Sequence, residues 1–307
     1  MSQLSNWTAD RLPGLGGRTF VVTGGNSGVG REAARVLAAR GARVVLACRD
    51  QAKARQAAGE INKTATGPAV ECVVVDLADL ASVRAAAAAI RARYLRIDAL
   101  VNNAGIMTCP ERRTSEGYEW QLASNHLGHF LLSALLFDLV EASAGRIVTT
   151  SSIAHKSGRI DFDDLMATRK YDPIKAYYQS KLANLLFAME LDRRLRAAGS
   201  AAMSVACHPG VSATNLQRTG PRGLLAVVFK LAMPLAQSAA AGALPTLLAA
   251  AGSEAEGGGY YGPQSMAEWR GSVGTARVAR VARDAAVAQR LWAVSEELVG
   301  CSFTPGR

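Results

Sequence analysis

The sequence predicts an α/β fold, namely a doubly wound and mostly parallel sheet with helices on both faces. Short β-branched runs alternate with longer segments of helical periodicity from residue 18 to residue 210, which is typical of a parallel sheet. Glycine-rich and polar motifs follow directly after the predicted strands. Because the ligand crevice of an open α/β sheet lies outside the carboxyl ends of its strands, we expect these motifs to converge on one edge.

The composition of the 307-residue chain narrows its possible partners. The formal charge is +10, which favours anionic ligands, but the basic residues are dispersed and only 6% of residues are aromatic. We therefore expect no nucleic-acid partner. The five cysteines include no Cys-x-x-Cys pair, which indicates a reducing compartment. Since no hydrophobic leader or membrane-spanning stretch is evident, we expect a cytoplasmic protein.

The first motif is a glycine-rich turn between a strand predicted at 18–23 and a helix predicted at 31–40. Glycines let the backbone turn sharply and approach a pyrophosphate, which the positive end of the following helix attracts. Strand, turn and helix together predict a Rossmann-type dinucleotide site. The residues predicted to contact the cofactor here are Gly24, Asn26, Ser27, Gly28, Val29 and Gly30.

The end of the second predicted strand, 43–48, bears on the choice between NADP and NAD. A carboxylate about twenty residues after the glycine turn would hold the ribose hydroxyls of NAD. Arg49 stands there instead, and a guanidinium suits the 2′-phosphate of NADP, so we expect NADP. Asp50 is the counter-evidence, because it could hold a ribose. The alternative is that Asp50 caps the helix predicted at 51–61.

Polar or small residues also follow the strands predicted at 70–75 and 99–101. An acid in this position either caps a helix or contacts the adenine, and small residues would let the backbone lie close to a cofactor. The candidates are Asp76, Leu77, Asn103, Ala104 and Gly105. A long helix is then predicted over 115–140. It carries His126 and His129, but no suitable carboxylate lies nearby in the sequence, so we expect no metal site.

Ser151 and Ser152 end the strand predicted at 146–150. Adjacent residues on a strand point to opposite sides, so only one hydroxyl can face a given site. A sixth strand, 205–207, ends just before Pro209-Gly210 at the same edge.

The helix predicted at 176–195 places Tyr177 and Lys181 four residues apart, on one face. A cation beside a phenol favours the phenolate, so we expect the pKa of Tyr177 to fall from about 10 toward neutrality. Such a group can exchange a proton with a substrate oxygen. The spacing alone is common, and the convergence of the other motifs supports this interpretation.

Taken together, the motifs resemble the short-chain dehydrogenase/reductase family over residues 18 to about 215, and its retinol-dehydrogenase-like and related bacterial members in particular. Tyr260-Tyr261-Gly262-Pro263 looks like actinobacterial relatives. The matching residues, in family order, are Thr23, Gly24, Gly28, Gly30, Asp76, Leu77, Asn102, Asn103, Ala104, Gly105, Asn125, Ser152, Tyr177, Ser180, Lys181, Pro209 and Gly210.

The resemblance implies a role for each candidate catalytic residue. Tyr177 would be the general acid/base, and Lys181 would hold the nicotinamide ribose and lower the pKa of the tyrosine. Ser152, selected over Ser151, would donate a hydrogen bond to the substrate oxygen. Asn125 would help to hold a water that relays protons to Lys181. These donors would face the oxygen on which charge develops.

Two departures from the family pattern bear on these expectations. Val211 and Thr214 are predicted cofactor contacts after Pro209-Gly210. The family pattern has a Val two residues before the Thr, whereas Ser212 stands at that position here, so the contact with the nicotinamide amide is less secure. Ser152 and Tyr177 are also unusually far apart, because a polar segment at 155–173 is inserted between them. We expect this surface insertion to weaken the usual oligomer, leaving a monomer or weak homodimer.

We expect residues 1–307 to form a single domain, with 18–210 as the cofactor and catalytic core and 211–307 as a small substrate-side region. Within the latter, the apolar stretch 223–235 is either a core helix or a lid over a lipophilic substrate. Contact with a membrane surface is a weaker alternative for this stretch. Helices are predicted at 239–251 and 285–298, with a turn into a last short strand at 257–261.

These expectations describe an NADP(H)-dependent oxidoreductase that interconverts an alcohol and its aldehyde or ketone, with a small lipophilic substrate. NAD is the alternative cofactor. Two rival functions are left open. One is reduction of a carbon–carbon double bond, as in protochlorophyllide reductases, which share the tyrosine and the lysine. The other is a nucleotide sensor without turnover, against which the full set of four candidate catalytic residues argues.

Overall fold

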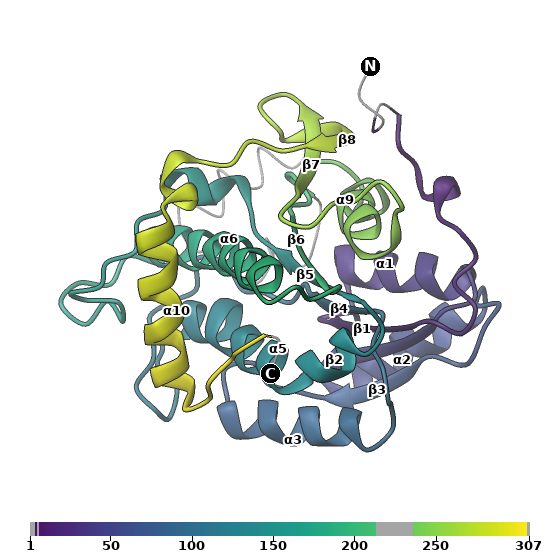
Figure 1. Ribbon diagram of the computed structural model, residues 1–307, viewed down its shortest axis with the longest axis horizontal. Coiled ribbons are helices and arrows are strands. Elements are labelled where there is room, and N and C mark those ends of the chain that lie inside the picture. The colour runs from purple at the N-terminus through teal and green to yellow at the C-terminus, as the bar shows by residue number, and fades with distance from the viewer. Residues whose placement is uncertain (1–3, 5, 213–235, 306–307) are drawn as a thin grey trace.

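The computed structural model describes residues 4, 6–212 and 236–305. Over these residues one eight-stranded sheet forms, in the order β3-β2-β1-β4-β5-β6-β7-β8 (Figure 1). Neighbouring strands are parallel except for the antiparallel pair β7 and β8. The strands are β1 (Thr19–Thr23), β2 (Arg43–Cys48), β3 (Glu71–Val74), β4 (Ala99–Asn102), β5 (Arg146–Thr150), β6 (Met203–Cys207), β7 (Tyr260–Ser265) and β8 (Arg270–Thr275).

Helices cover both faces of the sheet (Figure 1). One apolar core lies between the sheet and α1, α2 and α9, and a second lies between the sheet and α3, α5 and α6, with α10 packed against α6. The helices are α1 (Gly28–Ala39), α2 (Gln51–Asn62), α3 (Leu80–Arg91), α4 (Trp120–Leu122), α5 (Gly128–Glu141), α6 (Pro173–Ala197), α9 (Ala239–Ala251) and α10 (Ala285–Val299). Short 3-10 helices are η1 (Ala9–Arg11), η3 (Ile153–Ser157) and η5 (Arg280–Arg283), and η2 (Ala123–Leu127) is a π-helix.

The sequence specifies these elements locally. All five residues of β1 are buried, and Val21 lies opposite Val45 of β2 and Leu100 of β4, as expected for a central parallel strand covered on both faces. Several helices begin with an aspartate whose carboxylate accepts hydrogen bonds from free backbone N–H groups. These aspartates are Asp50, Asp79, Asp172 and Asp284. The predicted doubly wound α/β fold is confirmed.

One predicted element is wrong at its start, and one strand was not predicted. The helix predicted from residue 115 begins only at Trp120, because Gly117 makes a turn with φ at 84° and the Glu119 carboxylate caps the helix by accepting from the backbone N–H groups of Gln121 and Leu122. The sequence analysis also missed β8. Its residues, Arg-Gly-Ser-Val-Gly-Thr, lack an apolar run and gain their order from pairing with β7.

The segment predicted as a surface insertion, 155–173, is partly internal. Its charged residues are largely exposed, but Ile160 and Leu165 join an apolar cluster with α6, and His155 is fully buried. The insertion therefore contributes to the core beside α6, which carries Tyr177.

Candidate active site

The motifs after the strands converge, as predicted, on the carboxyl edge of the sheet. A cleft of about 560 Å³ lies there. It is lined by predicted cofactor residues, namely Gly24, Asn26, Ser27, Arg49, Asp76, Leu77, Ala104 and Gly105. The lining also contains residues that the sequence analysis did not single out, including Arg31, Ala47, Cys48, Lys53, Ile106 and Ser124. The other predicted residues of the glycine turn, Gly28, Val29 and Gly30, are not among its lining residues, and Val29 lies close to Gly242 of α9.

The glycine turn fits a dinucleotide. Gly24 and Gly28 have φ values of 65° and 55°, which glycine adopts without strain. A Cβ on Gly30 would lie 2.3 Å from the Asn103 side chain and 2.8 Å from the Gly24 carbonyl, so the turn can close tightly only with glycine there. Ser27 precedes α1 without making a side-chain cap. The uncapped N–H groups of α1 are therefore available to a phosphate.

A buried polar network that the sequence analysis missed ties this turn to the loop after β4. The Thr23 hydroxyl oxygen accepts from the backbone N–H groups of Asn103 (2.9 Å) and Ala104 (3.0 Å) and lies 2.9 Å from Nε2 of His129. Nδ1 of His129 lies 3.0 Å from the Asn125 carbonyl. Since a carbonyl only accepts, Nδ1 carries the proton and Nε2 accepts from the Thr23 hydroxyl.

Burial supports this arrangement, because it lowers the pKa of His129 to about 4 and keeps the ring neutral. His129 thus has a structural part in the site and links the glycine turn to Asn125. The described residues contain no cluster of three or more potential metal ligands.

Charged residues gather at the β2 end of the cleft. Asp50 caps α2, with one carboxylate oxygen 3.0 Å from the Lys53 backbone N and the other 2.8 Å from its Nζ. The capping alternative for Asp50 is therefore correct. Arg49 lies 3.9 Å from Asp76, and its side chain is 62% exposed. Its guanidinium is accordingly the least tightly held of the cations in this part of the cleft, since Arg31 is paired with Glu60 at 2.8 Å.

The two serines at the end of β5 differ as the alternation of a strand predicts. The Ser151 hydroxyl is buried and donates to the Lys181 carbonyl at 2.7 Å. Ser152 lies close to Tyr177, and its side chain opposes the rise of the phenol pKa that burial causes. The Ser152 Oγ also accepts from the Ala154 N–H at 3.2 Å, which leaves the hydroxyl proton free to be donated outward.

Tyr177 and Lys181 lie on one face of α6, both almost fully buried. The Lys181 Nζ is 5.9 Å from the centre of the Tyr177 ring and donates to the Thr150 carbonyl at 3.2 Å. Burial lowers the pKa of Lys181 to about 8 and raises that of Tyr177 to about 12, although the nearby Ser152 side chain opposes the latter shift. The predicted fall of the tyrosine pKa is therefore wrong for the protein alone, because removal of the phenol from water outweighs the nearby cation.

Asn125 lies in the π-helix η2 and is fully buried. Its side chain accepts from the Ile106 N–H at 2.8 Å and donates to the Ile106 carbonyl at 3.0 Å and to the Ser180 hydroxyl at 2.9 Å. A Cβ on Gly105 would lie 3.3 Å from both Asn125 Oδ1 and Lys181 Nζ. Gly105 thus connects the dinucleotide cleft to the catalytic candidates.

The loop after β6 lies beside the β7–β8 hairpin. Gly210 has φ at 63°, and the Val211 N–H donates to the Trp269 carbonyl at 2.8 Å. The Ser212 hydroxyl donates to the Pro209 carbonyl at 2.7 Å, so it is directed inward. The predicted contact Thr214 and the stretch 223–235 lie outside the described residues.

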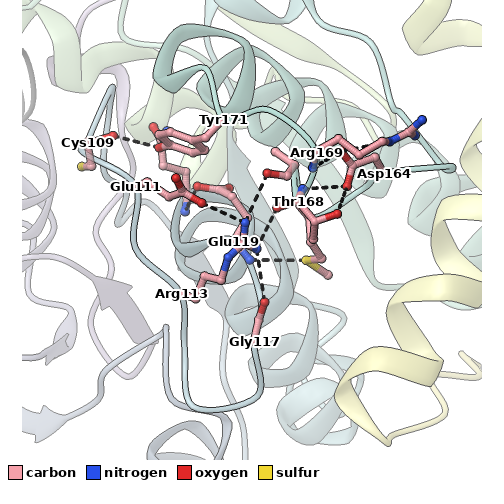
Figure 2. A network of polar contacts seen from close by, with 12 residues as sticks. Cys109, Glu111, Arg113, Gly117, Glu119, Asp164, Thr168, Arg169 and Tyr171 are labelled. Atoms are coloured by element: carbon pink, nitrogen blue, oxygen red, sulfur yellow. Dashed lines mark hydrogen bonds and ion pairs between the residues drawn. The ribbon is translucent and has the colours of Figure 1, made fainter.

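The loop after β4 is joined to the inserted segment by a polar network (Figure 2). The Tyr171 hydroxyl donates to the Cys109 carbonyl at 2.8 Å and accepts from the Gln121 side chain at 2.9 Å. Gln121 also donates to the Pro173 carbonyl at 3.0 Å, and Arg113 donates to the carbonyls of the insertion. These contacts fix the loop against the first turn of α6, one turn before Tyr177.

Comparison with known proteins agrees with this fold and site. The family model for short chain dehydrogenases matches residues 18–222. Human retinol dehydrogenase 13 is 45% identical over 296 residues, covering 92% of this chain and 85% of that protein, and human retinol dehydrogenase 12 is 41% identical over 289 residues, covering 93% and 87%.

Among solved structures, an uncharacterized protein from Mycobacterium paratuberculosis is 42% identical with a TM-score of 0.81, covering 97% of this chain and 99% of that one. An NAD(P)-dependent gluconate 5-dehydrogenase from Beutenbergia cavernae, solved with bound NADP, is 28% identical with a TM-score of 0.61, covering 78% and 91%.

The chain belongs to the short-chain dehydrogenase/reductase family. It is an oxidoreductase of the retinol-dehydrogenase-like kind, and the family's cofactor is a nicotinamide dinucleotide. The predicted family and enzyme class are confirmed. In the described part of the chain, no helix is long and apolar enough to cross a membrane.

Proposed function

We propose that the protein interconverts a lipophilic alcohol and its aldehyde or ketone with NADP(H), using Tyr177, Ser152, Lys181 and Asn125. One observation carries this proposal. The buried Tyr177 phenol, the Ser152 hydroxyl and the buried Lys181 ammonium lie together next to a cleft large enough for a dinucleotide. The curated relatives are named as retinol dehydrogenases, and retinol is an apolar alcohol, which supports a lipophilic substrate.

The cleft provides groups for each part of the cofactor. The uncapped start of α1 and the glycine turn would hold the pyrophosphate, while Arg49 would meet the 2′-phosphate of NADP. The loop at Gly105 and the buried Lys181 would hold the nicotinamide ribose. When bound, the nicotinamide supplies the two-electron chemistry of the reaction, and the protein residues orient the substrate and move the proton.

The side chains can protonate a carbonyl oxygen during reduction. With its pKa raised to about 12, Tyr177 carries its proton at neutral pH and can donate it to an oxygen that gains negative charge. The Ser152 hydroxyl, whose acceptor side is occupied by the Ala154 N–H, donates a second hydrogen bond to the same oxygen. The Lys181 ammonium then stabilises the resulting phenolate, and the reverse sequence serves alcohol oxidation.

The C-terminal elements also bear on assembly. Helix α10 packs on α6, where Arg194 stacks on the Trp292 ring at 4.3 Å, and on η2, where His126 hydrogen-bonds to Ser295 at 2.8 Å. We propose that 1–307 is one domain and that it is a monomer or weak homodimer, because α10 and the inserted segment already cover α6, which family members commonly use for dimerisation. Sedimentation that gives a stable tetramer at low concentration would contradict this part of the proposal.

The test of the proposed function is turnover of NADPH with a panel of carbonyl compounds, from short polar aldehydes to all-trans-retinal. The apolar members should react best, and Tyr177→Phe should lose turnover by at least about 100-fold while still binding NADPH. Tyr118→Phe is the matched control, because its hydroxyl bonds to the Leu298 carbonyl on α10. Cofactor binding without turnover in the unsubstituted protein would favour a sensor, and turnover confined to activated double bonds would favour the alkene reductase.

A further inference from the structure

His155 is a buried group that the mechanism above does not use. It lies in η3, three residues after Ser152, and is fully excluded from solvent. Its Nδ1 is 2.6 Å from the Ser152 carbonyl, and its Nε2 is 3.2 Å from the backbone N of Ala279, which lies at the start of η5. The histidine therefore connects the catalytic candidate Ser152 to a part of the chain more than a hundred residues away.

The two contacts fix the tautomer. The Ala279 N–H can only donate, so Nε2 is the unprotonated acceptor, and the Ser152 carbonyl can only accept, so Nδ1 carries the proton. Burial lowers the pKa of His155, which agrees with a neutral ring. Every polar atom of the imidazole is thus used, and the ring can rotate only by breaking a buried hydrogen bond.

The surroundings hold the ring in place. The His155 ring packs edge-on against Tyr260 of β7, with ring centres 5.5 Å apart. The adjacent Lys156 forms a salt bridge of 2.5 Å with Glu268 of the β7–β8 hairpin, and the Glu268 carboxylate also accepts from the Arg277 N–H at 2.7 Å. Glu268 is only 7% exposed, whereas the Lys156 side chain is 36% exposed, so this ion pair is partly shielded from water and connects η3 to the hairpin.

We propose that His155 is a positioning residue for Ser152. The Ser152 carbonyl accepts twice from His155, from its Nδ1 at 2.6 Å and from its backbone N at 3.1 Å. These bonds hold Ser152 in its extended conformation, with φ at −160° and ψ at 160°, and so fix where its side chain lies relative to Tyr177. The inference rests on the proposed function, since it assigns a task to Ser152 that only a reacting enzyme uses.

A pair of amide substitutions separates the two contacts of the ring. The Asn amide nitrogen can occupy the place of Nδ1, so His155→Asn retains a donor to the Ser152 carbonyl. The Gln side chain reaches the place of Nε2, so His155→Gln retains an acceptor for Ala279 but lacks the donor to Ser152. Ala279→Pro removes only the distal N–H, and the φ of −63° at this position suits proline.

The measurement is the rate of reduction of the best carbonyl substrate from the panel, per NADPH-binding site counted by calorimetry. Since a displacement of about 1 Å can cost about 100-fold in rate, we expect His155→Gln to lower kcat by about 10- to 100-fold with NADPH affinity unchanged. His155→Asn should stay within about 3-fold of the unsubstituted protein, and Ala279→Pro should lie between the two.

A double-mutant cycle with Ser152→Ala tests whether the loss of kcat in His155→Gln arises from a displaced Ser152. In the Ser152→Ala background, His155→Gln should cost nothing further, because the group it positions is gone. Equal losses in both backgrounds, or full activity of His155→Gln, would overturn the inference while leaving the proposed function intact. Full activity of Ser152→Ala would overturn the proposed role of the serine. Absence of turnover in the unsubstituted protein would overturn the proposed function. Either result would also refute the inference about His155.

Discussion

Replacing Arg49 with alanine should weaken binding of NADPH and leave binding of NADH nearly unchanged. Arg49 follows β2 and lines the cleft at the end where the 2′-phosphate of NADP would lie. The competing acid Asp50 is committed to capping α2 and to Lys53. An exposed cation after β2, next to an aspartate that is occupied as a helix cap, favours NADP over NAD.

The expected magnitude follows from the exposure of Arg49 and its weak ion pair. The Arg49 guanidinium lies 3.9 Å from Asp76, and its side chain is 62% exposed, so a water-like dielectric applies. Breaking this ion pair to bind a phosphate therefore costs at most about 1 kcal/mol. A phosphate carries a charge of about −1.5 to −2 and so attracts the guanidinium about twice as strongly, with charge-assisted hydrogen bonds added. The net loss in Arg49→Ala should therefore be about 1–2 kcal/mol, or about 5- to 30-fold in Kd.

The assay is calorimetric titration of NADPH and NADH into the unsubstituted protein and Arg49→Ala, at low and high salt. The preference for NADPH should shrink in the variant, and in the unsubstituted protein it should also shrink with salt, because exposed charges are screened. Arg31→Ala is the matched comparison, since Arg31 lines the same cleft but is paired with Glu60. Equal losses for both cofactors, or tighter binding of NADH by the unsubstituted protein, would refute the assignment of the phosphate to Arg49.

Three further predictions test other parts of the site. Lys181→Met should abolish turnover yet stabilise the protein near neutral pH. Burial lowers the lysine pKa to about 8, so keeping the buried ammonium charged costs the folded state up to about 3 kcal/mol of stability below pH 8. This cost is relieved as the pH rises from 8 toward 10.5, because the folded state then loses the proton while the unfolded state keeps it. Chemical denaturation should show this pH-dependent gain in the unsubstituted protein only, and a variant less stable at pH 7 would contradict it. Gly30→Ala should impair NADPH binding and lower Tm, since its Cβ would lie 2.3 Å from the Asn103 side chain; a variant with unchanged Kd and Tm would show that the turn can relax. Tyr171→Phe should cost about 1–2 kcal/mol of stability by removing the hydroxyl bonded to Cys109, and should raise KM for bulky carbonyls without changing NADPH affinity. A change confined to NADPH affinity would place the contacts of Tyr171 on the cofactor side of the site.

The sequence-based predictions failed where tertiary contacts, and not local sequence patterns, determine the structure. The helix predicted from residue 115 was wrong at its start because the sequence shows helical periodicity without showing that Glu119 would turn its carboxylate onto Gln121 and Leu122. Strand β8 was missed because its order comes from its pairing with β7. His129 was considered only as a metal ligand, whereas the fold places it between Thr23 and Asn125.

The sequence by itself determined the alternation of strands and helices up to residue 210, the family and the residues that meet at the site. Periodicity, glycine turns and strand-end motifs are local signals, and a parallel sheet brings all strand ends to one edge whatever the details of packing. That is why the sequence alone sufficed to place Tyr177, Lys181 and Ser152 together.

Only the tertiary structure decided the chemistry of those residues. The pKa of Tyr177 rises because the whole protein removes it from water, and the +1 charge four residues away does not outweigh that. The free proton of Ser152 depends on Ala154, and its orientation on His155 and a backbone N–H at Ala279. Burial and hydrogen-bond partners are properties of the packed chain, so spacing in the sequence cannot specify them.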